Sequence, residues 1–440
     1  MSPALASTMG LVVMFILGTA LPINMGALAF ALAFLIGVFA VGMTASQILA
    51  GFPGDLFVTL VGITYLFAIA QKNGTIDLLV HWAVRAVGGR IAAIPWVMFG
   101  VAAILTAIGA VSPAAVAIIA PIALRFARHY NIDPLMMGLL VVHGAQGGGF
   151  SPISIYGGIT NQIVERAGLP GDEMVLFLAS LLFNLAVAVA VYFVFGGARL
   201  IGRRDGVAHD EFEEGGRPSL PVRGHGGTPA APKGGEPHAV PALDAQRGLT
   251  LLGLLVLGVG SLAFGLNVGL MAITVAVALA LVAPESQKGT VDKVSWSTVL
   301  LIAGVITYVG VLQKSGAVDL VSGSVVALGA PLLGALLLCY IGGVVSAFAS
   351  STGVLGAIIP LAVPFLAGGE VGAVGMIAAL AISATIVDVS PFSTNGALVL
   401  ANAPEGEREK LFRRFLVYSG LVVVAGPLLA WAVLIVPGWL

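Results

Sequence analysis

Four serine-containing clusters mark the positions where this sequence can do chemistry inside apolar surroundings. Each joins serine or threonine to proline, glycine or asparagine. Serine is a good helix N-cap, and proline is tolerated at the first helical position because its missing N–H would be unpaired there. We therefore predict that each cluster begins a half-helix that points to the middle of a membrane. The candidate substrate-binding residues in these clusters are Ser112, Ser151, Ser154, Ser351, Thr352, Ser390, Ser393, Thr394 and Asn395.

Half-helix ends of this kind suit ions of both signs. A free helix N-terminus carries N–H groups and partial positive charge, which favour an anion. The preceding C-termini and unwound carbonyls favour Na⁺. Asp388 is the only carboxylate deep inside an apolar run, and such a charge is costly unless it is paired or functional. We predict that Asp388, Ser350, Gly149 and Gly109 form the Na⁺ sites.

Simpler interpretations exist for the same residues. Ordinary kinks in packed helices would also place Gly, Pro and Ser in these clusters, although four kinks related in pairs are less expected than one. For Asp388, the alternatives to a cation ligand are a proton carrier and a structural cap.

Composition indicates what kind of protein must position these clusters. Of the 440 residues, 58% are apolar and only 9% are charged, whereas soluble domains carry about 25% charged residues. An ordinary cytosolic enzyme and a disordered protein are therefore excluded, and an all-α polytopic membrane protein is predicted. The net charge of −1 offers no basic field for nucleic acid, and a single cysteine excludes an intramolecular disulfide.

The sequence also repeats itself. Residues 1–198 and 248–440 are separated by a polar, Gly- and Pro-rich stretch, 199–247, which we predict to be a flexible cytoplasmic linker. Four segment pairs recur in the same order: INMG and LNVG, QKNGTIDL and QKSGAVDL, SPAAVAIIAP and STGVLGAIIP, SPISIYG and SPFSTNG. Their offsets lie between 239 and 243 residues. Chance similarity would not keep one register over a whole half, so we predict an internal duplication.

Charge placement predicts the topology of the two repeats. If 92–127 and 332–367 are re-entrant hairpins, each half has five transmembrane crossings, and an odd number makes the two repeats inverted. One side of the membrane then receives 18 of the 20 Lys and Arg residues. Cytoplasmic loops are rich in these residues, so that side is cytoplasmic. The basic loops are 70–134, 199–247, 284–297 and 401–414.

The repeated motifs resemble those of the ion transporter superfamily. Within it the sequence is similar to the malonate/dicarboxylate carriers, the MatC-like group, and more distantly to the divalent anion/sodium symporters. The resemblance covers nearly the whole chain apart from the linker. It implies that Ser-Asn-Thr motifs at the hairpin tips bind substrate carboxylates and help form Na⁺ sites. It also implies a homodimer in which a transport part moves like an elevator against a scaffold.

The two hairpin tips depart from that motif to different degrees. The second reads Ser350-Ser351-Thr352, one residue away from it. The first reads Val111-Ser112-Pro113 and keeps one polar side chain. We expect backbone N–H groups from Ala114 onward to serve at the first tip.

These observations predict a secondary active transporter, not an enzyme, in the cytoplasmic membrane of a bacterium. The expected substrate is a small organic dianion, a C3–C4 dicarboxylate such as malonate, and the expected partners are the lipid bilayer and a second copy of the chain. No cofactor is expected beyond the coupling ion, for which Na⁺ is favoured over H⁺. A dianion entering a negative interior is opposed by about 2.3 kcal/mol per charge per 100 mV, which favours cation symport over uniport.

A cation/proton antiporter or arsenite-type exporter on the same fold, with Asp388 as the exchanging carboxylate, is the main alternative function. A passive channel and an intramembrane enzyme are less favoured. The chain has no HExxH motif and no second deep aspartate.

Overall fold

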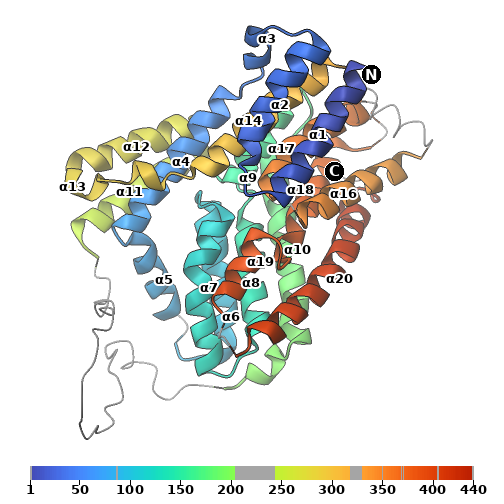
Figure 1. The fold of residues 1–440 in the computed structure, drawn as a ribbon. Coiled ribbons are helices and arrows are strands. Elements are labelled where there is room, and N and C mark those ends of the chain that lie inside the picture. Colours follow the sequence, from blue (N-terminus) through green and yellow to red (C-terminus); the bar gives the residue numbers. More distant parts are fainter. Residues whose placement is uncertain are drawn as a thin grey trace, which may run out of the picture.

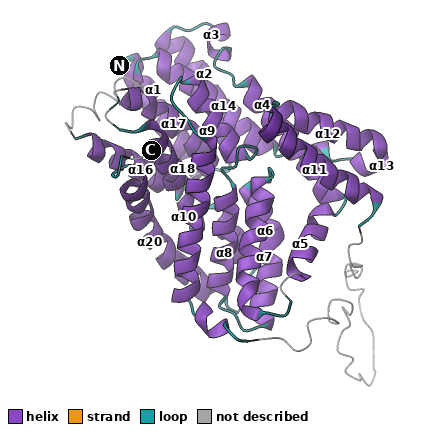
Figure 2. Ribbon diagram, turned by 180° about the vertical axis from the view of Figure 1, so that it is seen from behind, coloured by secondary structure: helices purple, strands orange, loops and turns teal. Residues whose placement is uncertain are grey.

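A computed structural model describes most of the chain. The described residues are 2–85, 88–203, 243–317, 330–348, 350–367, 369, 371–403 and 406–438. They form helices joined by turns and loops, and no strand occurs among them (Figure 2). The predicted all-α class is therefore confirmed. Most of the predicted linker 199–247 lies outside the described residues.

Seven helical segments in the described part are long and apolar enough to cross a membrane. Several of the seven, though not all, expose most of their apolar side chains, an arrangement that is unfavourable in water. On the helix that begins at Ala245, for example, Leu255, Leu262 and Phe264 are each more than half exposed. Lipid is the environment that such surfaces require. The seven segments are α1 (Pro3–Ala20), α4 (Gly54–Lys72), α10 (Glu173–Val194), α11 (Ala245–Phe264), α14 (Trp296–Lys314), the run Ala373–Ala401, and α20 (Arg408–Leu434).

Most of the remaining helices are shorter because Gly, Pro and Ser clusters interrupt the apolar runs. The run Ala373–Ala401 is itself broken into α18 (Ala373–Ile386), η5 (Val387–Val389) and α19 (Thr394–Ala401). The other short elements are α2 (Met25–Ile36), η1 (Gly37–Val41), α3 (Ala45–Leu49), α5 (Thr75–Arg85), η2 (Ile91–Ala93), α6 (Ile94–Ala107), α7 (Ser112–His129), α8 (Pro134–Gly148), α9 (Ile155–Arg166), η3 (Gly197–Leu200), α12 (Val268–Val282), α13 (Pro284–Gln287), η4 (Val291–Lys293), α16 (Pro331–Ser346) and α17 (Ser351–Ala367).

Two pairs of glycines bring the outer helices of the two halves into close contact. α4 packs along α12, and α14 packs along α2 (Figure 1). A Cβ atom on Gly62 would lie 2.5 Å from the carbonyl oxygen of Gly269, and one on Gly304 would lie 2.1 Å from that of Gly26. Small residues at helix crossings let membrane helices pack backbone to backbone. By the repeat offsets, Gly26 corresponds to Gly269 and Gly62 to Gly304, so the two crossings are equivalent.

The inner helices are also arranged alike in the two halves. In the first half α8 packs between α6 and α10, and in the second half α18 packs between α16 and α20. Each half also sends its hairpin helix to the other half: α7 packs against α19, and α17 packs against α9. These paired contacts are the ones that a duplication predicts. The inverted relation of the two halves, and their boundaries at 198 and 248, stay predictions.

Candidate substrate and cation site

The serines that cap the broken helices are Ser154 and Ser393. Each precedes its helix, α9 or α19, and accepts a hydrogen bond from the backbone N–H three residues on, at 3.2 Å and 3.4 Å. Each hydroxyl also donates to a carbonyl at the break, that of Gly149 or of Asp388, both at 2.5 Å. Because these hydroxyls are committed within their own turns, they have no proton left to donate to a substrate.

Ser151 and Ser390, the serines before proline, lie in the turn that precedes each helix. The prediction that they cap the helices was therefore wrong. A proline can begin a turn as readily as a helix, and here it does so. Ser151 donates through Oγ to the carbonyl of Ala107 at the end of α6. Ser390 accepts at Oγ from the N–H of Phe392, at 3.2 Å.

The first hairpin turns at Gly109, between α6 and α7. Its φ of 117° lies in the left-handed region that favours glycine, and an added Cβ would lie 2.4 Å from Ile63. The cap of α7 is Val111, with Ser112 as the first helical residue, so the predicted serine cap is wrong here too. A cap needs extended backbone, and Val111 supplies it. The Ser112 hydroxyl instead accepts from Asn395 Nδ2, at 2.8 Å.

Backbone donors at the first tip are fewer than expected. The N–H of Ala114 donates to the carbonyl of Val111, at 2.9 Å. It is therefore already used, and proline at position 113 has no N–H to offer. The prediction that N–H groups from Ala114 onward replace the missing side chains is not supported. Ser112 is the polar group that this tip contributes.

At the second hairpin tip, a chain of hydrogen bonds reaches Asp388, which lies in η5. The Ser351 hydroxyl donates to Asp388 Oδ1 at 2.6 Å, and the Ser346 hydroxyl donates to Ser351 Oγ at 2.8 Å. Asn395 Nδ2 lies 3.5 Å from the other carboxylate oxygen. Asp388 is 6% exposed and is the only Asp or Glu among the buried residues that the structure describes. Hydrogen bonds to a charged acceptor are stronger than neutral ones, so these donors partly offset its burial.

Tyr156 joins the two halves at the same place. Its side chain interacts with those of Thr352 and Ser112. Tyr156 and Asn395 occupy equivalent positions in SPISIYG and SPFSTNG, and each reaches the hairpin tip of the opposite half. Sequence reasoning missed both Tyr156 and Ser346. The equivalence of Tyr156 with Asn395 was the signal that could have identified it.

Two buried side chains near the breaks have polar atoms without hydrogen-bond partners among the described residues. They are Oδ1 of Asn395 and both polar atoms of the Gln146 side chain. Asn395 is 1% exposed and Gln146 is fully buried. An unpaired buried polar group costs about 1–3 kcal/mol. A bound ion, substrate or water would supply the missing partners.

Three of the residues predicted for the site either lie away from this buried cluster or have their polar atoms already hydrogen-bonded. Thr394 is exposed on α19, and Ser350 is only half-buried. The carbonyl of Gly149 accepts from both Ser154 Oγ and the N–H of Gly157. Its two lone pairs are thus used, which leaves none for Na⁺. No group of three His, Cys, Asp or Glu side chains that could hold a metal ion occurs in the part of the chain that the structure describes.

Comparison with known families agrees with this geometry. Residues 1–149 match the model described as the N-terminus of the dicarboxylate carrier protein MatC. The matched part of the chain is therefore similar to the N-terminal part of that carrier family. It ends at the break between α8 and α9, so it includes the whole first hairpin. The predicted resemblance to MatC-like proteins is confirmed, and this is a family of carriers rather than of enzymes.

The fold of the whole chain is similar to that of a transporter of known structure. The YdaH transporter of Alcanivorax borkumensis superposes with a TM-score of 0.59 over 98% of each chain, with 14% identical residues. At this identity the similarity concerns the fold alone. No curated protein matches the sequence.

Proposed function

We propose that this protein is a secondary active transporter of small dicarboxylates, C3–C4 compounds such as malonate. One observation carries the proposal: two hairpin tips and two helix breaks converge on a single buried carboxylate. The groups that meet there are Ser112, Ser351, Thr352, Asn395 and Asp388. The match of residues 1–149 to the MatC N-terminus supports a dicarboxylate as the substrate class.

The way this site can neutralise a dianion supports symport with a cation. No Lys or Arg occurs among the buried side chains of the described residues. The first N–H groups of α17 have no acceptor within their own helix, and with the hydroxyl of Thr352 they can bind a carboxylate. The hydroxyl of Ser351 donates to Asp388 and can join them only by leaving that bond. These are partial charges only. Cotransported cations supply the remaining positive charge.

We propose Na⁺ as that cation, with Asp388 as a ligand. Carboxylate and amide oxygens suit a hard cation. Among the described residues, Oδ2 of Asp388 has only the 3.5 Å contact with Asn395, and Oδ1 of Asn395 has no hydrogen-bond partner. Both oxygens are therefore available to an ion. Cotransport also offsets the cost of moving a dianion against the membrane potential, about 2.3 kcal/mol per charge per 100 mV.

We propose that the protein works as an elevator-type homodimer in the cytoplasmic membrane of a bacterium, and the close packing of the outer helices supports the scaffold that an elevator needs. The glycine crossings of α2 with α14 and of α4 with α12 form a close-packed outer layer suited to a scaffold. The candidate site is built from α7, α9, α17, α19 and the break at η5. Of these, α17 packs against α14 and α9 packs against α4, so the site borders the outer layer. In this proposal those elements move together and carry the substrate across.

A thermal-unfolding screen of the full-length protein tests the proposal. Malonate, succinate and malate are compared with acetate, each in Na⁺ and in choline buffer. Ligand at a hundred times its Kd stabilises the native state by about 2.7 kcal/mol. We expect dicarboxylates to raise the unfolding temperature in Na⁺ and to do so much less in choline. A shift with Na⁺ alone, indifferent to every dicarboxylate, would favour the antiporter instead.

A further inference from the structure

A polar cavity lies at the far end of α8 from the candidate site. Its volume is about 580 Å³, and it is lined by the loop between α7 and α8, the end of α10 with η3, and the start of α20. α8 has 15 residues, so its two ends are roughly 20 Å apart. The cavity is therefore separate from the carboxylate at the helix breaks.

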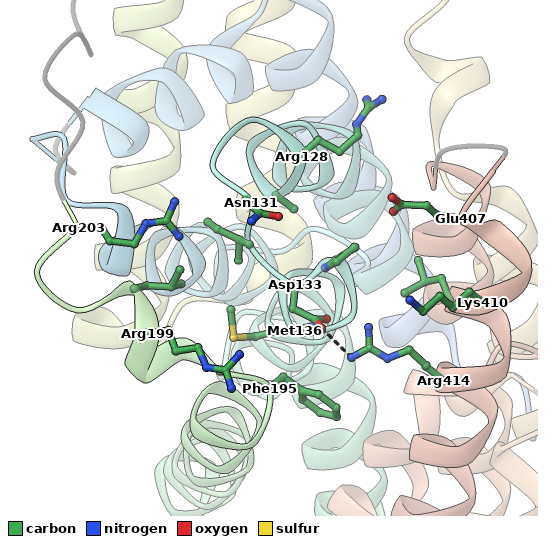
Figure 3. A pocket seen from close by; sticks show the side chains of 16 residues that line it. Arg128, Asn131, Asp133, Met136, Phe195, Arg199, Arg203, Glu407, Lys410 and Arg414 are labelled. Atoms are coloured by element: carbon green, nitrogen blue, oxygen red, sulfur yellow. Dashed lines mark hydrogen bonds and ion pairs between the residues drawn. The ribbon is translucent and has the colours of Figure 1, made fainter.

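The lining of this cavity is strongly cationic. Five basic side chains surround it, and only two carboxylates accompany them (Figure 3). The basic residues are Arg128, Arg199, Arg203, Lys410 and Arg414. Met136 and Phe195 add apolar surface. A cavity with this balance fits an anion that also carries an apolar part.

One of the two carboxylates and two of the five basic side chains already have partners within the protein. Asp133 caps α8 and pairs with Arg414 at 2.7 Å, and Arg414 also lies over the ring of Phe195, 5.5 Å from its centre. Arg203 donates to the carbonyl of Tyr130 at 2.8 Å. These contacts fix the walls of the cavity.

The other three cations are available to a ligand. Within the described part of the chain, the side chains of Arg128, Arg199 and Lys410 have neither a hydrogen bond nor an ion pair. All three belong to exposed residues. Arginine matches phosphate geometry with paired N–H donors, and lysine binds phosphate as a point charge.

Helix lengths place the cavity at the depth of lipid headgroups. α10 has 22 residues and ends at Val194, which is enough to cross a hydrocarbon core of about 30 Å. α20 has 27 residues, and the stretch after Arg414 already spans that thickness, so its first turns project beyond it. The contact between Arg414 and Phe195 puts the two helix ends at the same level.

We propose that this cavity binds a phosphate-bearing anion at the membrane surface. The phosphate contacts Arg128, Arg199 and Lys410. The apolar side chains of Met136 and Phe195 accommodate the group to which the phosphate is attached. The phosphate can belong to an anionic phospholipid headgroup or to a soluble phosphate compound, because the same three cations would recognise either. The inference does not depend on the transported substrate.

The test uses the full-length protein in nanodiscs of zwitterionic lipid. Phosphatidylglycerol at increasing mole fraction is one arm, and inorganic phosphate at constant ionic strength is the other. Bound anionic lipid is counted by native mass spectrometry, and the unfolding temperature is measured in parallel. Each basic residue near the surface contributes about a fivefold change in affinity for anionic lipid. Arg199→Gln with Lys410→Gln should therefore weaken binding about 25-fold.

Arg413→Gln provides the matched control. Arg413 lies on α20, as Lys410 does. It is paired with Glu409 at 2.8 Å and does not line the cavity. This variant should bind like the wild type. Equal unfolding temperatures of all variants in purely zwitterionic lipid exclude misfolding.

The outcomes of the two arms separate the sources. Saturable binding of phosphatidylglycerol that phosphate does not displace supports the lipid headgroup. Stabilisation by phosphate alone, lost in the double variant, supports a soluble phosphate compound in the same cavity. The proposal is overturned if neither ligand binds, or if Arg413→Gln weakens binding as much as the double variant.

Discussion

The hydroxyl of Ser351 lies 2.6 Å from Oδ1 of Asp388, which joins the tip of the α16–α17 hairpin to the break between α18 and α19. This bond connects the group proposed to bind substrate with the group proposed to bind the cation. A ligand at either residue changes the partner of the other. The contact is therefore the point at which substrate and ion can be coupled.

Replacing Asp388 with Asn removes the charge and keeps the size of the side chain. If Asp388 binds Na⁺, the variant should need more Na⁺ for half-maximal uptake, and its dependence on Na⁺ concentration should be flatter. The reason is that an amide oxygen is a weaker cation ligand than a carboxylate. Uptake measured against Na⁺ concentration at two pH values checks this, with Asp292→Asn, an exposed residue of η4, as control.

The same measurement separates the other roles of this residue. If Asp388 carries a proton instead, wild-type uptake should change with pH and uptake by the Asn form should not. If Asp388 is only a structural cap, both dependences should survive the substitution. A variant that behaves like the wild type in every condition removes Asp388 from the coupling mechanism.

Replacing Ser351 with Ala should impair transport without preventing folding. The substitution removes a hydrogen bond to a charged group, which contributes about 1.5–3 kcal/mol, so the KM for substrate or for Na⁺ should rise roughly tenfold or more. Ser419→Ala is the matched control, because Ser419 is also buried but bonds within its own helix, to the carbonyl of Leu416. Equal kinetics of the two variants would contradict the role given to Ser351.

Ser112 and Asn395 should depend on each other energetically. Their side chains are 2.8 Å apart although they are 283 residues apart in the sequence. Residues in direct contact show coupling energies of about 0.5–3 kcal/mol in double-mutant cycles. A cycle of Ser112→Ala and Asn395→Ala, scored by substrate-dependent stabilisation, should give a value in this range. Strictly additive effects would show that the contact is not used in binding.

The positions of the hairpins and helix breaks could be predicted from the sequence. Clusters of Gly, Pro and Ser interrupt apolar runs there, and the hairpins 92–127 and 332–367 correspond closely to α6 with α7 and α16 with α17. The reason is local: such residues stop helices wherever they occur. The position of Asp388 at a break could be predicted because no other carboxylate lies so deep in an apolar run.

The identity of the capping serine could not be predicted in the same way. In SPIS and SPFS both serines are suitable by type, and proline at the first helical position favours the first of them. The structure places a turn after that serine, so that Ser154 and Ser393 are the caps. The role of Tyr156 was also hidden, because its partners come from both hairpins and depend on how the two halves pack.

The orientation of the protein in the membrane is open to a direct check. We expect Lys293→Cys to resist an impermeant thiol reagent in intact cells and Pro170→Cys to react, since the basic loops should be cytoplasmic. Both positions are exposed, and the native Cys339 is fully buried and should not interfere. Reaction at position 293 with protection at 170 would reverse the orientation.

Uptake of labelled malonate and succinate into proteoliposomes, with and without an inward Na⁺ gradient, tests the central claim most directly. We expect saturable accumulation above equilibrium when the gradient is present. It should collapse to equilibration or less when choline replaces Na⁺, and acetate should not compete. Absence of saturable dicarboxylate uptake in either condition, from protein that unfolds cooperatively, would contradict the account.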